Sequence, residues 1–251
     1  MKYPGRIIRK GDTDTRIVKA IQTRLQQLGI ERFDGTGIFG TKTEQAIRLF
    51  QARFIDQEGM PLTIDGEVGS ITWEALFGKA KVPDNHSTSN KWIEAVLQTA
   101  RGEIGVLEQP SGSNWGPRIK KYLQTVNINF PAAWCAAFVY WCFEETALAA
   151  EKPNPLVKTG GVLAHWNKTT GKKITAEEAV NNPALIKPGQ IFIMSFGGGL
   201  GHTGIVESVQ GGFITVIEGN TNDGGSREGV GVFRRTRKIA TINKGFIEYK
   251  I

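Results

Sequence analysis

The chain has 251 residues, of which 40% are hydrophobic and 22% charged, and its formal net charge is +7. This length allows one large domain or two ordinary ones with a sizeable core, and no apolar run reaches the roughly 18 residues that a membrane-spanning helix needs. The charge suits an anionic partner, but the lysines and arginines are dispersed and no zinc-finger or RNA-binding motif is present, so we expect no nucleic-acid partner.

The first part of the chain carries three segments with apolar residues at helical spacing. They predict helices over residues 12–28, 41–54 and 72–77, the first and last of which stop at a glycine. Residues 80–91 are polar and have no periodicity, which predicts a linker. We therefore expect a three-helix domain over residues 1–79.

The turns before the second and third helices share one pattern. Each has Asp-Gly, a short spacer, an apolar residue, Gly and then Thr, so that residues 34–43 match residues 65–72 with two extra residues in the first copy. Such Asp-Gly pairs are also ordinary tight turns that lead into helices. On this pattern, residues 12–78 resemble the three-helix peptidoglycan-binding domain attached to many cell-wall hydrolases. The matching residues are Val18 to Leu28, Phe33-Asp34-Gly35, Phe39-Gly40, Thr43, Ala46, Phe50-Gln51, Asp65-Gly66, Val68-Gly69 and Thr72-Trp73.

The resemblance implies binding of glycan or stem peptide along a groove near these turns, without catalysis. Phe39 and Trp73 are interpreted as core residues rather than as a platform for the ligand. The partner expected for this domain is therefore bacterial peptidoglycan.

The rest of the chain, residues 92–251, changes from helical to strand periodicity. Helical spacing is found over residues 92–102 and 118–126, and a more apolar helix is expected over 132–150. From Ile186 onward the period is two, with glycine-rich turns between segments. The strands expected there are 191–194, 202–209, 213–217, 230–234 and 245–249, with loops over 197–201 and 218–228. Helices followed by an antiparallel meander predict an α+β fold.

Cys135 is predicted in the first turn of the apolar helix. The unsatisfied N–H groups and the positive dipole end of a helix start favour the thiolate, which is the nucleophilic form of cysteine. A lone cysteine in such a stretch is also typical of a small apolar core residue. The second cysteine, Cys142, lies two turns further along the same face, too far away for a disulfide.

Polar residues at the ends of two neighbouring strands complete a candidate site. His202 opens a strand directly after the glycine loop, and Glu218 and Asn220 end the next strand. Because Glu218 and Asn220 are two residues apart they point to one face, and the hairpin brings them next to His202. A thiol, an imidazole and an orienting carboxylate or carboxamide together activate cysteine for attack on an amide. The alternative for Glu218 is a solvated charge at the end of a strand. The other histidine of this segment, His165, is interpreted as structural or exposed.

On these residues, the segment 92–251 resembles the CHAP amidohydrolase/peptidase family, part of the papain-like group of bacterial cell-wall hydrolases. The resemblance is carried by Asn114 with Ile119 and Tyr122-Leu123, Trp134-Cys135-Ala136-Ala137-Phe138, Lys187-Pro188-Gly189-Gln190-Ile191, Gly201-His202-Thr203-Gly204-Ile205-Val206 and Glu218-Gly219-Asn220-Thr221. It implies a papain-like domain in which Cys135 is the nucleophile, His202 the general base and Glu218 the orienting acid. Asn220 is expected to assist.

We expect the substrate to contact Asn114, Trp115 and Trp134. Relatives with an Asp-Cys-Ser signature use the aspartate to hold a free amino terminus of the stem peptide, but Trp134 stands at that position here, so this mode of binding is not expected. No metal or other cofactor is expected, because the acidic loop that binds calcium in some relatives is absent before the cysteine. The Cys135 backbone N–H is one candidate oxyanion donor.

These features together predict a peptidoglycan hydrolase that cleaves an amide bond through an acyl-enzyme, either as an N-acetylmuramoyl–L-alanine amidase or as a stem or cross-bridge endopeptidase. The basic segment 1–10 lacks the apolar stretch of a secretory signal. We therefore expect a protein that is made in the cytoplasm without a signal peptide and acts on the cell wall after release. The expected setting is a phage or prophage endolysin, or else an injected effector amidase or a tail lysin. A monomer is expected for this architecture. The alternatives in other classes are a non-catalytic wall-binding protein and a cytoplasmic thiol amidase.

Overall fold

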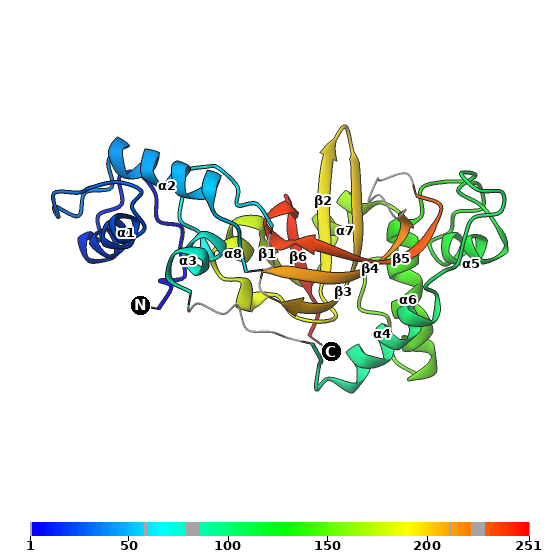
Figure 1. Ribbon diagram of the computed structural model, residues 1–251. Helices are drawn as coiled ribbons and strands as arrows, with labels where there is room; N and C mark the ends of the chain where they lie inside the picture. The colour runs from blue at the N-terminus through cyan, green and yellow to red at the C-terminus, as the bar shows by residue number, and fades with distance from the viewer. Residues whose placement is uncertain (1, 58–59, 79–85, 211, 222–228, 251) are drawn as a thin grey trace. The chain divides into compact units, whose positions relative to one another are not determined.

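The computed structural model divides the chain into two compact units (Figure 1). One comprises Met1–Pro83 with Val180–Pro183, and the other comprises Asp84–Ala179 with Ala184–Ile251. The residues that the structure describes are 2–57, 60–78, 86–210, 212–221 and 229–250. The part of the predicted linker at 80–85 therefore lies outside the described residues. Within those residues, every helix is too short or too polar to cross a bilayer.

Three helices and their connecting turns form the first unit: α1 (Thr15–Gln27), α2 (Thr41–Arg53) and α3 (Ser70–Phe77). The side chain of Asp14 caps α1 by accepting a hydrogen bond from the Ile17 N–H at 3.1 Å. At the other end of the unit, α3 stops at Gly78, which adopts the left-handed φ of 63° that glycine tolerates best. Phe39 and Trp73 are buried in the core, as expected from the sequence.

Two buried glutamines explain the repeated turn pattern of this unit. Gln22 on α1 donates to Thr43 Oγ1 at 2.9 Å, and Gln51 on α2 donates to Thr72 Oγ1 at 3.3 Å. Each glutamine thus reaches the threonine at the start of the following helix, in both cases 21 residues further on. The Gln51 side-chain oxygen also accepts the backbone N–H groups of Asp65 and Gly66, at 3.1 and 2.9 Å. The two copies therefore share the glutamine–threonine hydrogen bond, and in the second copy the glutamine also holds the Asp65-Gly66 turn.

The second unit contains helices followed by most of the strands. Its helices are α4 (Lys91–Gly102), α5 (Pro117–Thr125), α6 (Cys135–Ala149) and α7 (Val162–Lys168), with a 3-10 turn at Ile239–Thr241. The short helix α8 (Ala176–Asn181) and the 3-10 turn at Pro183–Leu185 are divided between the units, because Val180–Pro183 belong to the first. Its strands are β1 (Lys172–Thr175), β2 (Ile191–Gly197), β3 (Leu200–Gln210), β4 (Phe213–Thr221), β5 (Gly231–Lys238) and β6 (Gly245–Glu248). They pair antiparallel in the order β1-β6-β2-β3-β4-β5, which confirms the α+β fold.

Helix α6 is buried along most of its length and packs on strands β3 and β4. Gly219 on β4 makes this contact close: a Cβ at that position would lie 2.6 Å from Trp134 Cζ3 and 2.7 Å from Phe138 Cβ. Because real side-chain atoms do not approach so closely, only glycine fits between the strand and the start of the helix. The start of α6 is thereby held against strand β4.

Three of the differences between the structure and the sequence prediction concern the elements around Cys135 and His202. Helix α6 begins at Cys135 rather than Ala132, so the cysteine is the first helical residue. Strand β4 continues through Thr221, where a polar loop was predicted from Glu218, because Glu218 and Asn220 are buried and find partners there. The glycine loop is the tight turn of a long β2–β3 hairpin (Figure 1), with left-handed φ at Gly197, Gly198 and Gly199.

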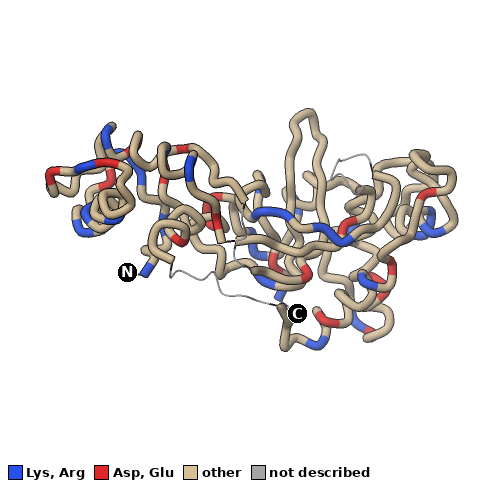
Figure 2. Tube along the Cα trace, in the orientation of Figure 1, with Lys and Arg blue, Asp and Glu red and all other residues tan. Residues whose placement is uncertain are grey.

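Charged residues are spread along the chain in both units, and lysines and arginines are interspersed with acidic residues (Figure 2). Strand β5 is a local exception, because four of its eight residues are basic. One of these basic residues, Arg237, proves to belong to the candidate site.

Candidate active site

Cys135 occupies the first position of α6, where the backbone N–H groups have no acceptor within the helix. The residue before it, Trp134, caps the helix without a side-chain hydrogen bond, and the first turn contains no acidic residue that would oppose a thiolate. The thiol therefore stands at the positive end of the helix dipole. Cys135 is 4% exposed.

His202 on β3 and Glu218 on β4 form a buried pair across the central hairpin. Glu218 Oε2 lies 2.8 Å from His202 Nε2, and the two side chains are 0% and 2% exposed. The strand neighbour Gly204 leaves space for this carboxylate, because a Cβ there would lie 2.8 Å from Glu218 Cγ. A carboxylate only accepts hydrogen bonds, so Nε2 carries a hydrogen and Nδ1 is left to take up a proton.

The second ring nitrogen of His202, Nδ1, is the one left for proton transfer. It is buried and makes no hydrogen bond within the described part of the chain. Burial by itself lowers the pKa of His202, but the electrostatic interactions with Cys135 and Glu218 outweigh burial and raise the pKa to about 9. The imidazolium form is thus favoured at neutral pH, as it is in a thiolate–imidazolium pair.

Glu218 has a second partner that the sequence did not indicate. Arg237 on β5 donates from Nη2 to Glu218 Oε2 at 2.7 Å, and its Nε donates to Oε1. Burial raises the pKa of Glu218, but the hydrogen bonds from Arg237 and His202 outweigh it and lower the pKa to about 2. Arg237 lies in a run of basic residues that is typical of a solvated strand, so only the three-dimensional pairing reveals its partner.

Asn220 lies beside the site but bonds to other neighbours than His202. Its backbone is left-handed, with φ of 55°. With the side-chain amide oriented so that both ends have partners, its oxygen accepts the backbone N–H of Trp134 at 3.3 Å. Its nitrogen donates to Asn114 Oδ1 at 3.3 Å and to the Gly229 carbonyl at 3.0 Å. Asn220 therefore ties the end of β4 to the residue before the cysteine and to the loop that precedes α5.

The predicted substrate contacts fall into two groups. Trp134 is fully buried, and its indole N–H donates to Glu108 Oε1 at 2.8 Å, so this side chain is core and is not available to a substrate. Asn114 and Trp115 are partly exposed in the loop before α5. The other oxygen of Glu108 accepts the Asn114 N–H at 3.0 Å. The buried Glu108, which no sequence signal indicated, thus clamps this loop to the residue before Cys135.

The remaining cysteine and the second buried histidine take no part in the site. Cys142 is fully buried, and burial raises the pKa of its thiol; both cysteines are free. His165 is buried with its Nε2 2.7 Å from the Tyr249 hydroxyl, and burial lowers its pKa to about 4. Over the described residues, no three His, Cys, Asp or Glu side chains are grouped to hold a metal ion.

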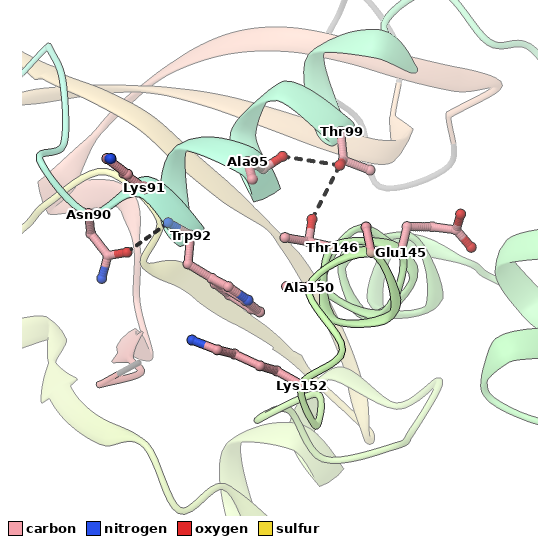
Figure 3. A pocket seen from close by; sticks show the side chains of 10 residues that line it. Asn90, Lys91, Trp92, Ala95, Thr99, Glu145, Thr146, Ala150 and Lys152 are labelled. Atoms are coloured by element: carbon pink, nitrogen blue, oxygen red, sulfur yellow. Dashed lines mark hydrogen bonds between the residues drawn. The ribbon is translucent and has the colours of Figure 1, made fainter.

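A pocket of about 590 Å³ lies between α4 and the C-terminal part of α6 (Figure 3). Trp92 and Lys152 line it, and Thr99 and Thr146 meet there through a 3.2 Å hydrogen bond between their hydroxyls. None of the predicted catalytic residues lines this pocket, which lies at the end of α6 opposite to Cys135. The pocket is therefore separate from the candidate active site.

A helix-borne thiol, a buried imidazole and a carboxylate behind it, set on an α+β fold, are the parts of a cysteine-dependent hydrolase. Comparison with family models gives two matches: the CHAP domain over residues 127–220 and the putative peptidoglycan binding domain over residues 15–76. The chain thus contains a CHAP domain preceded by a peptidoglycan-binding domain, and both predicted resemblances are confirmed. This combination of domains is that of a peptidoglycan hydrolase. Neither the curated proteins nor the solved structures gave a match.

Proposed function

We propose that this protein hydrolyses an amide bond of peptidoglycan through an acyl-enzyme formed on Cys135. The observation that carries the proposal is the arrangement of His202, whose Nε2 is held by Glu218 at 2.8 Å while its Nδ1 has no hydrogen-bond partner in the described part of the chain, and whose pKa is raised by Cys135 and Glu218. This leaves one imidazole nitrogen for orientation and the other for proton transfer.

The proposed reaction begins when the Cys135 thiolate attacks the amide carbonyl carbon and forms a tetrahedral oxyanion. His202 then gives its Nδ1 proton to the leaving amine, the C–N bond breaks, and a thioester remains on the sulfur. Water attacks the thioester while Nδ1 takes its proton, and the C–S bond breaks to release the carboxylic acid and the thiolate. The Cys135 backbone N–H, a first-turn donor without a helical acceptor, is a candidate to stabilise the oxyanion.

The peptidoglycan-binding domain gives this chemistry its substrate. Tethering a catalytic domain to an insoluble polymer raises the local substrate concentration without any new contact at the active site. Both an N-acetylmuramoyl–L-alanine amidase and a stem or cross-bridge endopeptidase fit the proposed mechanism, because both cleave amides. The setting that we propose is action on the bacterial wall after release from the cytoplasm, as in an endolysin.

The test is mass spectrometry of the soluble products released from purified peptidoglycan, with Cys135→Ala as the control. Free L-alanine amino termini with unmodified lactyl groups on the glycan would identify an amidase. New termini within the stem or the cross-bridge would identify an endopeptidase. If the wild type and Cys135→Ala release equally little, the hydrolytic proposal is wrong and the chain binds the wall without cutting it.

A further inference from the structure

The guanidinium group of Arg237 is fixed behind the candidate active site. Its two hydrogen bonds engage both oxygens of Glu218, in the parallel fork that arginine forms with carboxylates. The guanidinium carbon also lies 5.5 Å from the centre of the Phe192 ring, and that ring is fully buried. Only 14% of the Arg237 side chain is exposed. The cation is thus held from two sides.

A second arginine fork on the same strand shows what is particular to Arg237. Arg234 donates to both oxygens of Glu207, at 2.6 and 2.9 Å, but 51% of its side chain is exposed. That carboxylate is also paired with Arg101 and does not contact the site. The Arg237–Glu218 pair, by contrast, is shielded from solvent and ends on His202. Buried ion pairs contribute little net stability compared with apolar residues of the same size, so stability alone does not account for Arg237.

We propose that Arg237 is a positioning residue of the active site, which holds the Glu218 carboxylate ionised and in one orientation so that His202 keeps Nδ1 directed at Cys135. This inference rests on the function proposed above. Glu218 Oε2 is shared by His202 Nε2 and Arg237 Nη2, and Oε1 is occupied by Arg237 Nε. Rotation of the carboxylate would break two hydrogen bonds to the guanidinium, so the oxygen that meets the imidazole stays in place.

Removing the guanidinium changes the protonation of the whole set. The titratable or charged groups that face one another here are Cys135 from α6, His202 from β3, Glu218 from β4 and Arg237 from β5. Without Arg237, burial acts on Glu218 against only one remaining partner and favours the neutral acid. A neutral Glu218 no longer stabilises the imidazolium, and the thiolate that the imidazolium supports is then lost at a higher pH than in the wild type.

The experiment measures the rate of Cys135 alkylation by iodoacetamide between pH 4 and 9 in the full-length protein, with Cys135→Ala giving the background from Cys142. The acid limb of this profile is the pH range in which alkylation slows as the pH falls. We expect Arg237→Met to move the acid limb up by about one pH unit, so that alkylation at a pH below it is roughly tenfold slower than in the wild type. Arg237→Lys keeps the charge without the fork and is expected to recover part of the shift. Arg234→Met, which removes the other fork of the strand, is expected to match the wild type.

The proposal is overturned if Arg237→Met and Arg234→Met both follow the wild-type profile, since Arg237 is then only structural. If circular dichroism shows that Arg237→Met is unfolded, Arg237→Lys decides: an unchanged profile overturns the proposal and a shifted one supports it. Release of products from peptidoglycan is measured in parallel, where Arg237→Met should lower kcat more than it changes KM. A wild type that releases nothing, together with a shifted alkylation limb, would reject the hydrolase function and leave the role of Arg237 intact.

Discussion

Gly219 lets the start of helix α6 lie directly on strand β4, and replacing it with alanine should disturb stability and catalysis together. The added Cβ would lie 2.6 Å from Trp134 Cζ3 and 2.7 Å from Phe138 Cβ. Carbon atoms in contact prefer separations of about 3.5–4.0 Å, so helix and strand must separate by about 1 Å. Overpacking of this kind costs about 1–3 kcal/mol, which for a domain of this size lowers Tm by about 3–10 °C.

The same displacement moves Cys135, because it is the residue next to Trp134. A misplacement of about 1 Å between reacting groups can lower a rate by roughly 100-fold, so we expect kcat to fall by at least about tenfold while KM changes little. The assays are thermal unfolding followed by circular dichroism and the rate of release of soluble peptidoglycan fragments. Gly102→Ala is the matched control, since this glycine is exposed and a Cβ added to it would have no atom within 4 Å. A Gly219→Ala protein with wild-type Tm and kcat would refute the argument that this contact positions the thiol.

Buried polar groups give three further predictions. Glu218→Gln should lower kcat roughly 10³-fold, because His202 loses its orienting carboxylate. It should also destabilise the protein by about 3–5 kcal/mol in denaturant unfolding, because the Arg237 charge is left without its carboxylate. An unchanged kcat would remove Glu218 from the mechanism. The pKa of His165 is lowered from 6.5 to about 4, so the folded state prefers the neutral ring and about 3 kcal/mol of stability is lost as pH falls from about 6.5 to 4. His165→Gln should flatten this part of the stability–pH curve, and an equally steep curve would contradict the assignment. Gln51→Ala should destabilise the first unit by about 1–3 kcal/mol in denaturant unfolding, because the N–H groups of Asp65 and Gly66 lose their acceptor; no change in the midpoint would show that water replaces the amide.

The elements with clear periodicity could be predicted from the sequence. The spacing of apolar residues indicated α1, α2 and α4 to within a few residues, and the change of period at Ile186 indicated the sheet. The short elements α7, α8 and β1 were not predicted. They have only four to seven residues, so they contain too few turns or alternations to show a period, and they are set by packing.

The candidate site was predictable where it depends on neighbours along one hairpin. His202 and Glu218 are brought together by the pairing of two consecutive strands, which sequence can indicate. Arg237 and Glu108 reach the site from a later strand and from an earlier loop. Their contacts depend on tertiary packing, which leaves no local pattern in the sequence. The basic run around Arg237 and the turn-rich loop around Glu108 would read the same if these residues were exposed to solvent.

The division of the candidate site between a helix and a later hairpin has a consequence for how the protein acquires activity. Cys135 is synthesised well before His202 and Glu218, and these residues meet only when non-local contacts between α6 and the sheet have formed. Such long-range contacts form late, after the local ones, because closing the intervening loop costs entropy. A nascent or partly unfolded chain therefore carries the thiol without its base. The proposed hydrolysis therefore requires the completed fold of this domain, because neither the helix nor the hairpin carries the whole site.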